Sequence, residues 1–133
     1  MIDARDERGS MLPAIGGLLV VGLAVLGLCL DVAALHVTYV RASTVSDAAA
    51  EAGAAMIDEA RLHADEVTLD PVEAQRIAAS VVADAGMEPQ EVDATESEVC
   101  VSAHTAHRTL ALTFVGLRDV NVVVRACARP VTG

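Results

Sequence analysis

The chain has no lysine and no tryptophan, and Tyr39 and Phe114 are its only tyrosine and phenylalanine. Without lysine it can form neither a Schiff base nor the phosphate-binding lysine of a P-loop. Cations are scarce as well, because nine arginines stand against 19 acidic residues and leave a net charge of -10. Nucleic-acid binding needs clustered cations and, for single strands, aromatic stacking, so nucleic acid is not expected as a partner.

The sequence does contain one long apolar run. Residues 11–30 carry no charge, and about 20 apolar residues are enough to cross about 30 Å of hydrocarbon. Arg5 and Arg8 precede the run, as they would in a cleaved signal peptide, which is the rival interpretation. The run is long for the apolar part of such a peptide, however, and no small-residue cleavage site closes it cleanly. We therefore expect an uncleaved single-pass membrane anchor.

The arginines on either side of the run predict its orientation. Arg5 and Arg8 lie just before it, whereas Arg41 is the only basic residue near its other end. The positive-inside rule then places the N-terminus in the cytoplasm and the rest of the chain outside it, at the cell membrane. The predicted organisation is a cytoplasmic tail (1–10), a transmembrane helix (11–32), a projecting helix (33–65) and a small extracytoplasmic domain (66–133).

The segment after the apolar run is rich in alanine, the best helix former, and up to Leu62 it contains no proline and Gly53 as its only glycine. The helix is therefore predicted to continue to Leu62. Small apolar residues recur at spacings of three and four, which marks one helix face, with Ala50 lying off it. This face can pack on the chain's own domain or on neighbouring helices, and the pattern leaves both open. The helix-packing candidates are Val45, Ala49, Ala52 and Met56.

The remainder of the chain predicts a small mixed domain. Asp70 and Pro71 are typical of the start of a helix and Gly86 of its end. The apolar face of this helix is predicted to consist of Val72, Ile77, Val81 and Val82. Residues 87–96 are acidic and indicate a loop, whereas alternating apolar residues predict strands around 99–104, 110–114 and 120–128, with a turn at 116–119.

These elements together predict an α+β fold. A long N-terminal transmembrane helix continues into an extracytoplasmic helix. A short helix and a small two- or three-stranded antiparallel sheet follow it.

Two cysteines occupy the polar side of the predicted strands. Cys100 alternates with Ser102 and His104, and Cys127 is in phase with Asn121 and Arg125. The two sulfurs can meet if these strands are neighbours, and a compartment outside the cytoplasm permits oxidation. We therefore expect a Cys100–Cys127 disulfide, the alternative being two reduced cysteines packed as small residues.

Other polar residues predict no chemistry. Asp31 borders the apolar run, where a carboxylate lies either among lipid headgroups or in a contact with another helix. His104 and His107 are three residues apart, an offset that points them to opposite faces of a strand, so no metal site is expected. The serines and Cys100 lack any nucleophile motif. No catalytic residue, cofactor or small-molecule substrate is predicted, and the chain is not expected to be an enzyme.

The amino-terminal region carries a recognisable order of motifs. Glu7-Arg8-Gly9-Ser10 precedes the apolar run, Leu30-Asp31-Val32 closes it, and Arg41 and an alanine-rich stretch at 47–54 follow. Over residues 7–55 the chain resembles the amino-terminal region of TadE/TadG-like Flp pilus-assembly proteins. The resemblance implies a membrane-anchored, pilin-like structural or assembly component of an Flp-type (tight adherence) pilus or related secretion apparatus. Its partners would be other apparatus proteins or further copies of itself, and no catalytic role is implied.

One departure narrows this expectation. Pilin-like precursors are cut after a glycine and usually carry glutamate at the fifth mature position, but Ala14 occupies that position if Gly9 is the cleavage site. An anchored assembly factor is therefore favoured over a major filament subunit. The alternative function is a single-pass anchor that presents an acidic protein-interaction module to another envelope complex.

Overall fold

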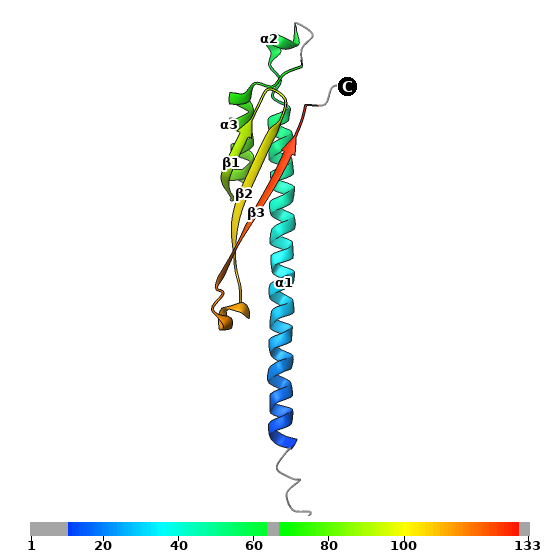
Figure 1. The fold of residues 1–133 in the computed structure, drawn as a ribbon, viewed down its shortest axis with the longest axis vertical. Helices are drawn as coiled ribbons and strands as arrows, with labels where there is room; N and C mark the ends of the chain where they lie inside the picture. The colour runs from blue at the N-terminus through cyan, green and yellow to red at the C-terminus, as the bar shows by residue number, and fades with distance from the viewer. Residues whose placement is uncertain (1–10, 64–66, 131–133) are drawn as a thin grey trace, which may run out of the picture.

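The computed structural model describes residues 11–63 and 67–130 and confirms the α+β class (Figure 1). The described part holds three helices, a three-stranded sheet and one 3-10 turn. In chain order they are α1 (Met11–Ala54), α2 (Glu59–Leu62), α3 (Pro71–Asp84), β1 (Glu88–Ala94), β2 (Val99–Arg108), η1 (Leu112–Val115) and β3 (Asp119–Ala128).

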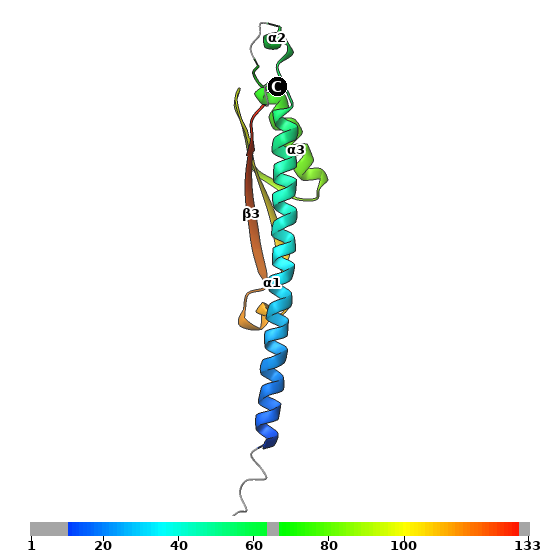
Figure 2. The same cartoon turned by 90° about the vertical axis from the view of Figure 1, so that its right-hand side faces the viewer.

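The elements form two layers around the second half of α1. The sheet is antiparallel, in the order β1-β2-β3. α1 packs against β2 and β3, while α3 lies beside α1 and packs against β1. The first half of α1 extends beyond the sheet as a single bare helix (Figures 1 and 2).

The core is built mainly from alanine and valine side chains. Neither aromatic residue contributes to it, since Tyr39 and Phe114 are both exposed. Gly53 illustrates how closely the layers approach: a Cβ atom there would lie 3.0 Å from Val99 Cγ1 and 3.1 Å from the carbonyl oxygen of Ala74. The packing contacts of the core therefore come from backbones that lie close together rather than from large side chains. The buried apolar residues of the core cluster are Ala42, Ala49, Ala50, Leu69, Ala74, Ala78, Val82, Met87, Val99, Val101, Ala103 and Val124.

The predicted caps of α3 are confirmed. The Asp70 carboxylate accepts hydrogen bonds from the backbone N–H groups of Val72 (3.0 Å) and Glu73 (3.2 Å), and Gly86 has the positive φ of 74° that suits a helix end. The predicted apolar face was wrong at Val72, which is 78% exposed. Val82 is buried as predicted and Ile77 and Val81 are half-buried, and the rest of the buried face is formed by Ala74 and Ala78.

The projecting helix is shorter than predicted. It ends at Ala54 rather than at Leu62, because the chain then turns to pair with the segment that precedes α3. Ile57 forms a β-bridge with Leu69, and Asp58 N–H donates to the carbonyl of Thr68 (2.9 Å). Helical propensity was overridden by these contacts with a distant segment.

Two strand assignments were also wrong. Residues 88–94, predicted as a loop, form the edge strand β1, in which only Val92 and Ala94 are half-buried; the rest of the strand is exposed and shows no hydrophobic alternation. The segment around Leu110 and Phe114, predicted as a strand, lies in the connection between β2 and β3 and contains the 3-10 turn η1. The predicted strands around 99–104 and 120–128 are confirmed as β2 and β3, while the third strand is β1 rather than the segment 110–114.

Candidate membrane anchor and its docked loop

The first half of α1 presents apolar side chains on every side. Pro13–Ala54 contains the one helix of the described chain that is long and apolar enough to cross a membrane. Every residue from 13 to 30 is exposed except Gly27, which is half-buried. Large apolar residues that remain exposed include Leu18, Leu19, Val20, Val21, Leu23, Leu26 and Leu30. A surface of this kind is stable against hydrocarbon rather than water.

Asp31 ends this bare segment, and it is not at the surface. Its side chain is 2% exposed, and its carboxylate accepts three backbone N–H groups from the connection between β2 and β3. Leu110 N–H donates to Oδ1 (2.8 Å), and Ala111 and Leu112 N–H donate to Oδ2 (2.8 and 2.9 Å). Both alternatives considered from the sequence were therefore incomplete, because the partner of Asp31 is a loop of its own chain.

The same loop, residues 109–117, also forms several hydrogen bonds within itself. Thr113 Oγ1 donates to the carbonyl of Thr109 (2.6 Å), and Thr109 Oγ1 donates to the carbonyl of Leu117. The N–H groups of Phe114, Gly116 and Leu117 donate to carbonyls within the loop. Gly116 reverses the chain with a positive φ of 92°. The loop is therefore a compact unit with a polar interior.

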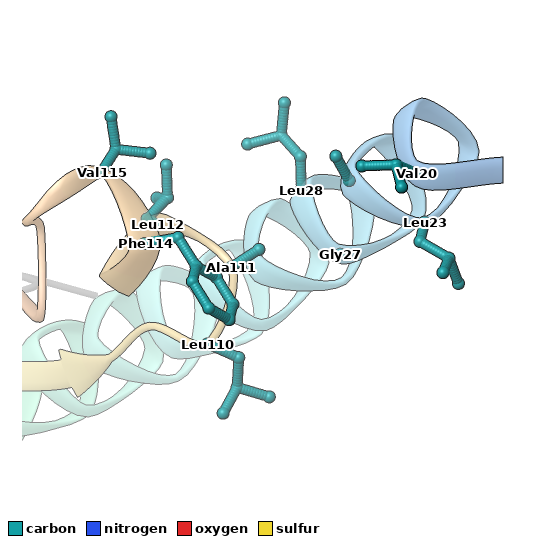
Figure 3. A pocket seen from close by; sticks show the side chains of 10 residues that line it. Val20, Leu23, Gly27, Leu28, Leu110, Ala111, Leu112, Phe114 and Val115 are labelled. Atoms are coloured by element: carbon teal, nitrogen blue, oxygen red, sulfur yellow. The ribbon is translucent and has the colours of Figure 1, made fainter. Parts of the chain in front are cut away.

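The loop lies close against α1 just below Asp31. Gly27 permits this approach, since a Cβ atom there would lie 2.9 Å from the Cβ of Ala111. Loop and helix together border an apolar groove of about 850 Å³, and every side-chain atom drawn in Figure 3 is carbon. The groove is lined by Val20, Leu23, Ala24, Gly27, Leu28, Leu110, Ala111, Leu112, Phe114 and Val115.

The helix-packing candidates lie mainly inside the chain's own core. Ala49 is fully buried, and Val45 and Met56 pack against the core cluster, while Ala52 is half-buried. Ala50, expected off this face, is 1% exposed. The buried face is thus broader than the predicted stripe, because α1 is covered by the sheet on one side and by α3 on another.

Cys100 and Cys127 are joined by a disulfide, with their Cα atoms 4.0 Å apart. They stand opposite each other in the antiparallel register of β2 and β3, on the sheet face that points away from α1. Glu98 lies close to both sulfurs, and within the described residues this is the one group of potential metal ligands that gathers. Since the two sulfurs are bonded to each other, they are not available as thiolate ligands.

Arg41 and the two histidines have structural partners, whereas Cys29 is free. Arg41 donates to the carbonyl of Ala85 (3.3 Å), and so links α1 to the end of α3. His107 Nδ1 lies 3.2 Å from Thr38 Oγ1, whereas His104 lies 3.7 Å from Glu88, so the two histidines do diverge. Cys29 is a free, exposed cysteine within the bare part of α1.

Comparison with known proteins adds no assignment: no protein-family model, no curated protein and no solved structure matches the chain.

Sequence reasoning missed the docked loop. Leu110, Leu112 and Phe114 alternate with smaller residues, and alternation was interpreted as a strand. A signal was present, because the nine residues 109–117 hold two threonines and a glycine but no charge, and Arg108 and Arg118 flank them directly. Thr109 and Thr113 are spaced to bond the backbone of a turn. The contact with Asp31 spans about 80 positions and has no sequence signature.

We expect the change Asp31→Ala to release the loop. Three backbone N–H groups would lose their acceptor, and even one hydrogen bond to a charged group shifts an equilibrium by about tenfold or more. Trypsin cleavage after Arg118, measured on the full chain in lipid vesicles, should therefore become about tenfold faster or more. Asp47→Ala, which removes an exposed acid from the same helix, is the control. Equal cleavage of the two variants would show that Asp31 does not hold the loop.

Proposed function

We propose that this protein is a membrane-anchored structural or assembly component of an Flp-type pilus or related secretion apparatus. The bare apolar half of α1 serves as the anchor, with the N-terminus in the cytoplasm, and the sheet-bearing half lies outside the cytoplasm. The resemblance of residues 7–55 to TadE/TadG-like proteins supports the choice of apparatus. The observation that carries the proposal is the exposed side of α1 beyond the anchor.

That exposed side continues the apolar surface of the anchor. Sheet and α3 cover two sides of the upper part of α1, and a third side stays open along its length (Figure 2). Val37 and Val40 are 67% and 47% exposed on it, and Thr44 and Ala48 follow at helical spacing and are exposed as well. Small residues such as Thr44 and Ala48 permit close helix–helix approach, and Val37 and Val40 add apolar surface to it. A rod with such a side is suited to stacking against neighbouring helices of an assembly.

The described residues give no support to catalysis. A catalytic site combines a nucleophile or base with an orienting partner in a polar pocket. The groove beside Gly27 is lined by apolar residues alone, and the described acidic residues that pair with arginine do so on the surface. A role in packing and assembly accounts better for these features than a reaction.

Crosslinking in native membranes tests the proposal. With an affinity tag after Gly133, the wild-type chain should form covalent adducts with components of the Flp-type apparatus, identified by mass spectrometry. Val37→Glu places a charge on the open side of α1 and should reduce these adducts strongly, because burying an unpaired charge is costly. Val72→Glu is the matched control: Val72 is 78% exposed on α3, and this change should leave the adducts intact.

Two results would count against the proposal. Adducts confined to proteins of another envelope complex would support an anchored interaction module and exclude the pilus assignment. Equal crosslinking of the two glutamate variants would show that the open side of α1 is not the contact surface.

A further inference from the structure

We propose that residues 109–117 form a membrane loop that inserts into the lipid leaflet at the Leu30 end of the anchor. The loop would provide a second, shallow contact with lipid acyl chains beside the transmembrane helix. This inference rests on the membrane anchoring proposed above, and it concerns a different segment of the chain.

The loop exposes its large apolar side chains. Leu110, Phe114, Val115 and Leu117 are 74%, 93%, 77% and 55% exposed. Four large apolar side chains within eight residues are costly in water, because removing apolar surface from water is favourable. No charged residue lies between Arg108 and Arg118 to offset this cost.

The loop lies beside the end of the apolar helix. The Cβ of Ala111 approaches Gly27, which lies four residues before Asp31. At about 1.5 Å per residue this places the contact about 6 Å below Asp31. Segments that lie in the membrane interface are buried by about 5 to 10 Å. The loop thus lies beside the bare part of α1 (Figure 1), and apolar side chains of the loop and of the anchor line the same groove (Figure 3).

Most backbone N–H groups of the loop are hydrogen-bonded. A loop enters an apolar medium more easily when its N–H and C=O groups are bonded, because unsatisfied polar groups are costly there. Asp31 accepts the N–H groups of residues 110–112, and those of residues 109, 114, 116 and 117 donate to carbonyls of the loop or of Arg118. The two threonine hydroxyls also point inward to carbonyls. These bonds satisfy seven of the nine backbone N–H groups of the loop, while its large apolar side chains are exposed.

Positive charges flank the loop. Arg108 and Arg118 stand at the two ends of the loop, both exposed, and Arg108 is paired in register with Asp119 on β3. Long arginine side chains keep their charge in the headgroup region while the chain beside them is buried. The two arginines thus mark the level at which lipid phosphates would lie. Lipid therefore fits the loop better than water, and the bonded backbone distinguishes it from a loop awaiting a strand partner.

Single-tryptophan variants test this directly, because the natural chain contains no tryptophan. The full chain carrying Phe114→Trp is reconstituted into phosphatidylcholine vesicles with brominated acyl chains. We expect blue-shifted emission, loss of fluorescence to the bromolipid and shielding from aqueous acrylamide. Leu110→Trp gives a second reporter on the same loop. Leu19→Trp in the anchor should respond like Phe114→Trp, and Val72→Trp on α3 should show the opposite behaviour.

The controls separate the possible failures. If Leu19→Trp is quenched by bromolipid while both loop reporters respond to acrylamide like Val72→Trp, the loop is in water and the inference is overturned. If the loop reporters are shielded from both quenchers, protein rather than lipid covers the loop, and the inference is overturned as well. If Leu19→Trp itself escapes the bromolipid, the anchor proposal fails together with the loop.

Discussion

The change Cys127→Ser should lower the free energy of unfolding by about 3 to 4 kcal/mol, because the Cys100–Cys127 bond closes a loop in a domain with little apolar mass. The two cysteines are 27 positions apart and join the two longest strands, β2 and β3. Proteolysis of the full chain in detergent at increasing urea concentration gives the measurement. Cys29→Ser, which removes the free cysteine of the anchor, is the control and should leave the unfolding midpoint unchanged.

The oxidation state itself is open to a direct check. In protein taken from membranes and alkylated without reduction, mass spectrometry should find a modified thiol at Cys29 only. Modification of Cys100 and Cys127 to the same extent would mean that the pair is reduced in the cell. That result would contradict both the disulfide and the oxidising compartment in which we place the sheet.

Local patterns predicted the parts of the fold that depend on neighbouring residues. The apolar run, the caps of α3 at Asp70 and Gly86, and the inward and outward faces of β2 and β3 were all readable, because each is decided within a few positions. The register of Cys100 with Cys127 followed from those faces once the two strands were assumed to be neighbours.

The errors arose where distant segments decide the outcome. α1 ends at Ala54 because the chain must turn to pair near Leu69. Ala50 is buried because both the sheet and α3 cover α1. β1 is an edge strand, and an edge strand with one solvated face needs few apolar residues, so its acidic sequence indicated a loop. None of these contacts has a local periodicity.

The docked loop shows the same limit at the candidate site. Asp31 was correctly marked as a boundary residue, but its partners lie about 80 positions away. A carboxylate at the end of an apolar run does not indicate which N–H groups will donate hydrogen bonds to it. Only the fold reveals that this acid serves as the acceptor for three N–H groups of a loop.

The central claim is that residues 11–30 anchor the chain with its sheet outside the cytoplasm, and a pair of reporters fused after Gly133 tests it most directly. A reporter active only outside the cytoplasm should give full activity, and one active only in the cytoplasm should be silent, because the arginines favour a cytoplasmic N-terminus. Deletion of residues 11–30 should reverse both signals. Activity of the cytoplasmic reporter on the intact chain would contradict the account, since the sheet, the disulfide and the membrane loop would then all lie on the wrong side.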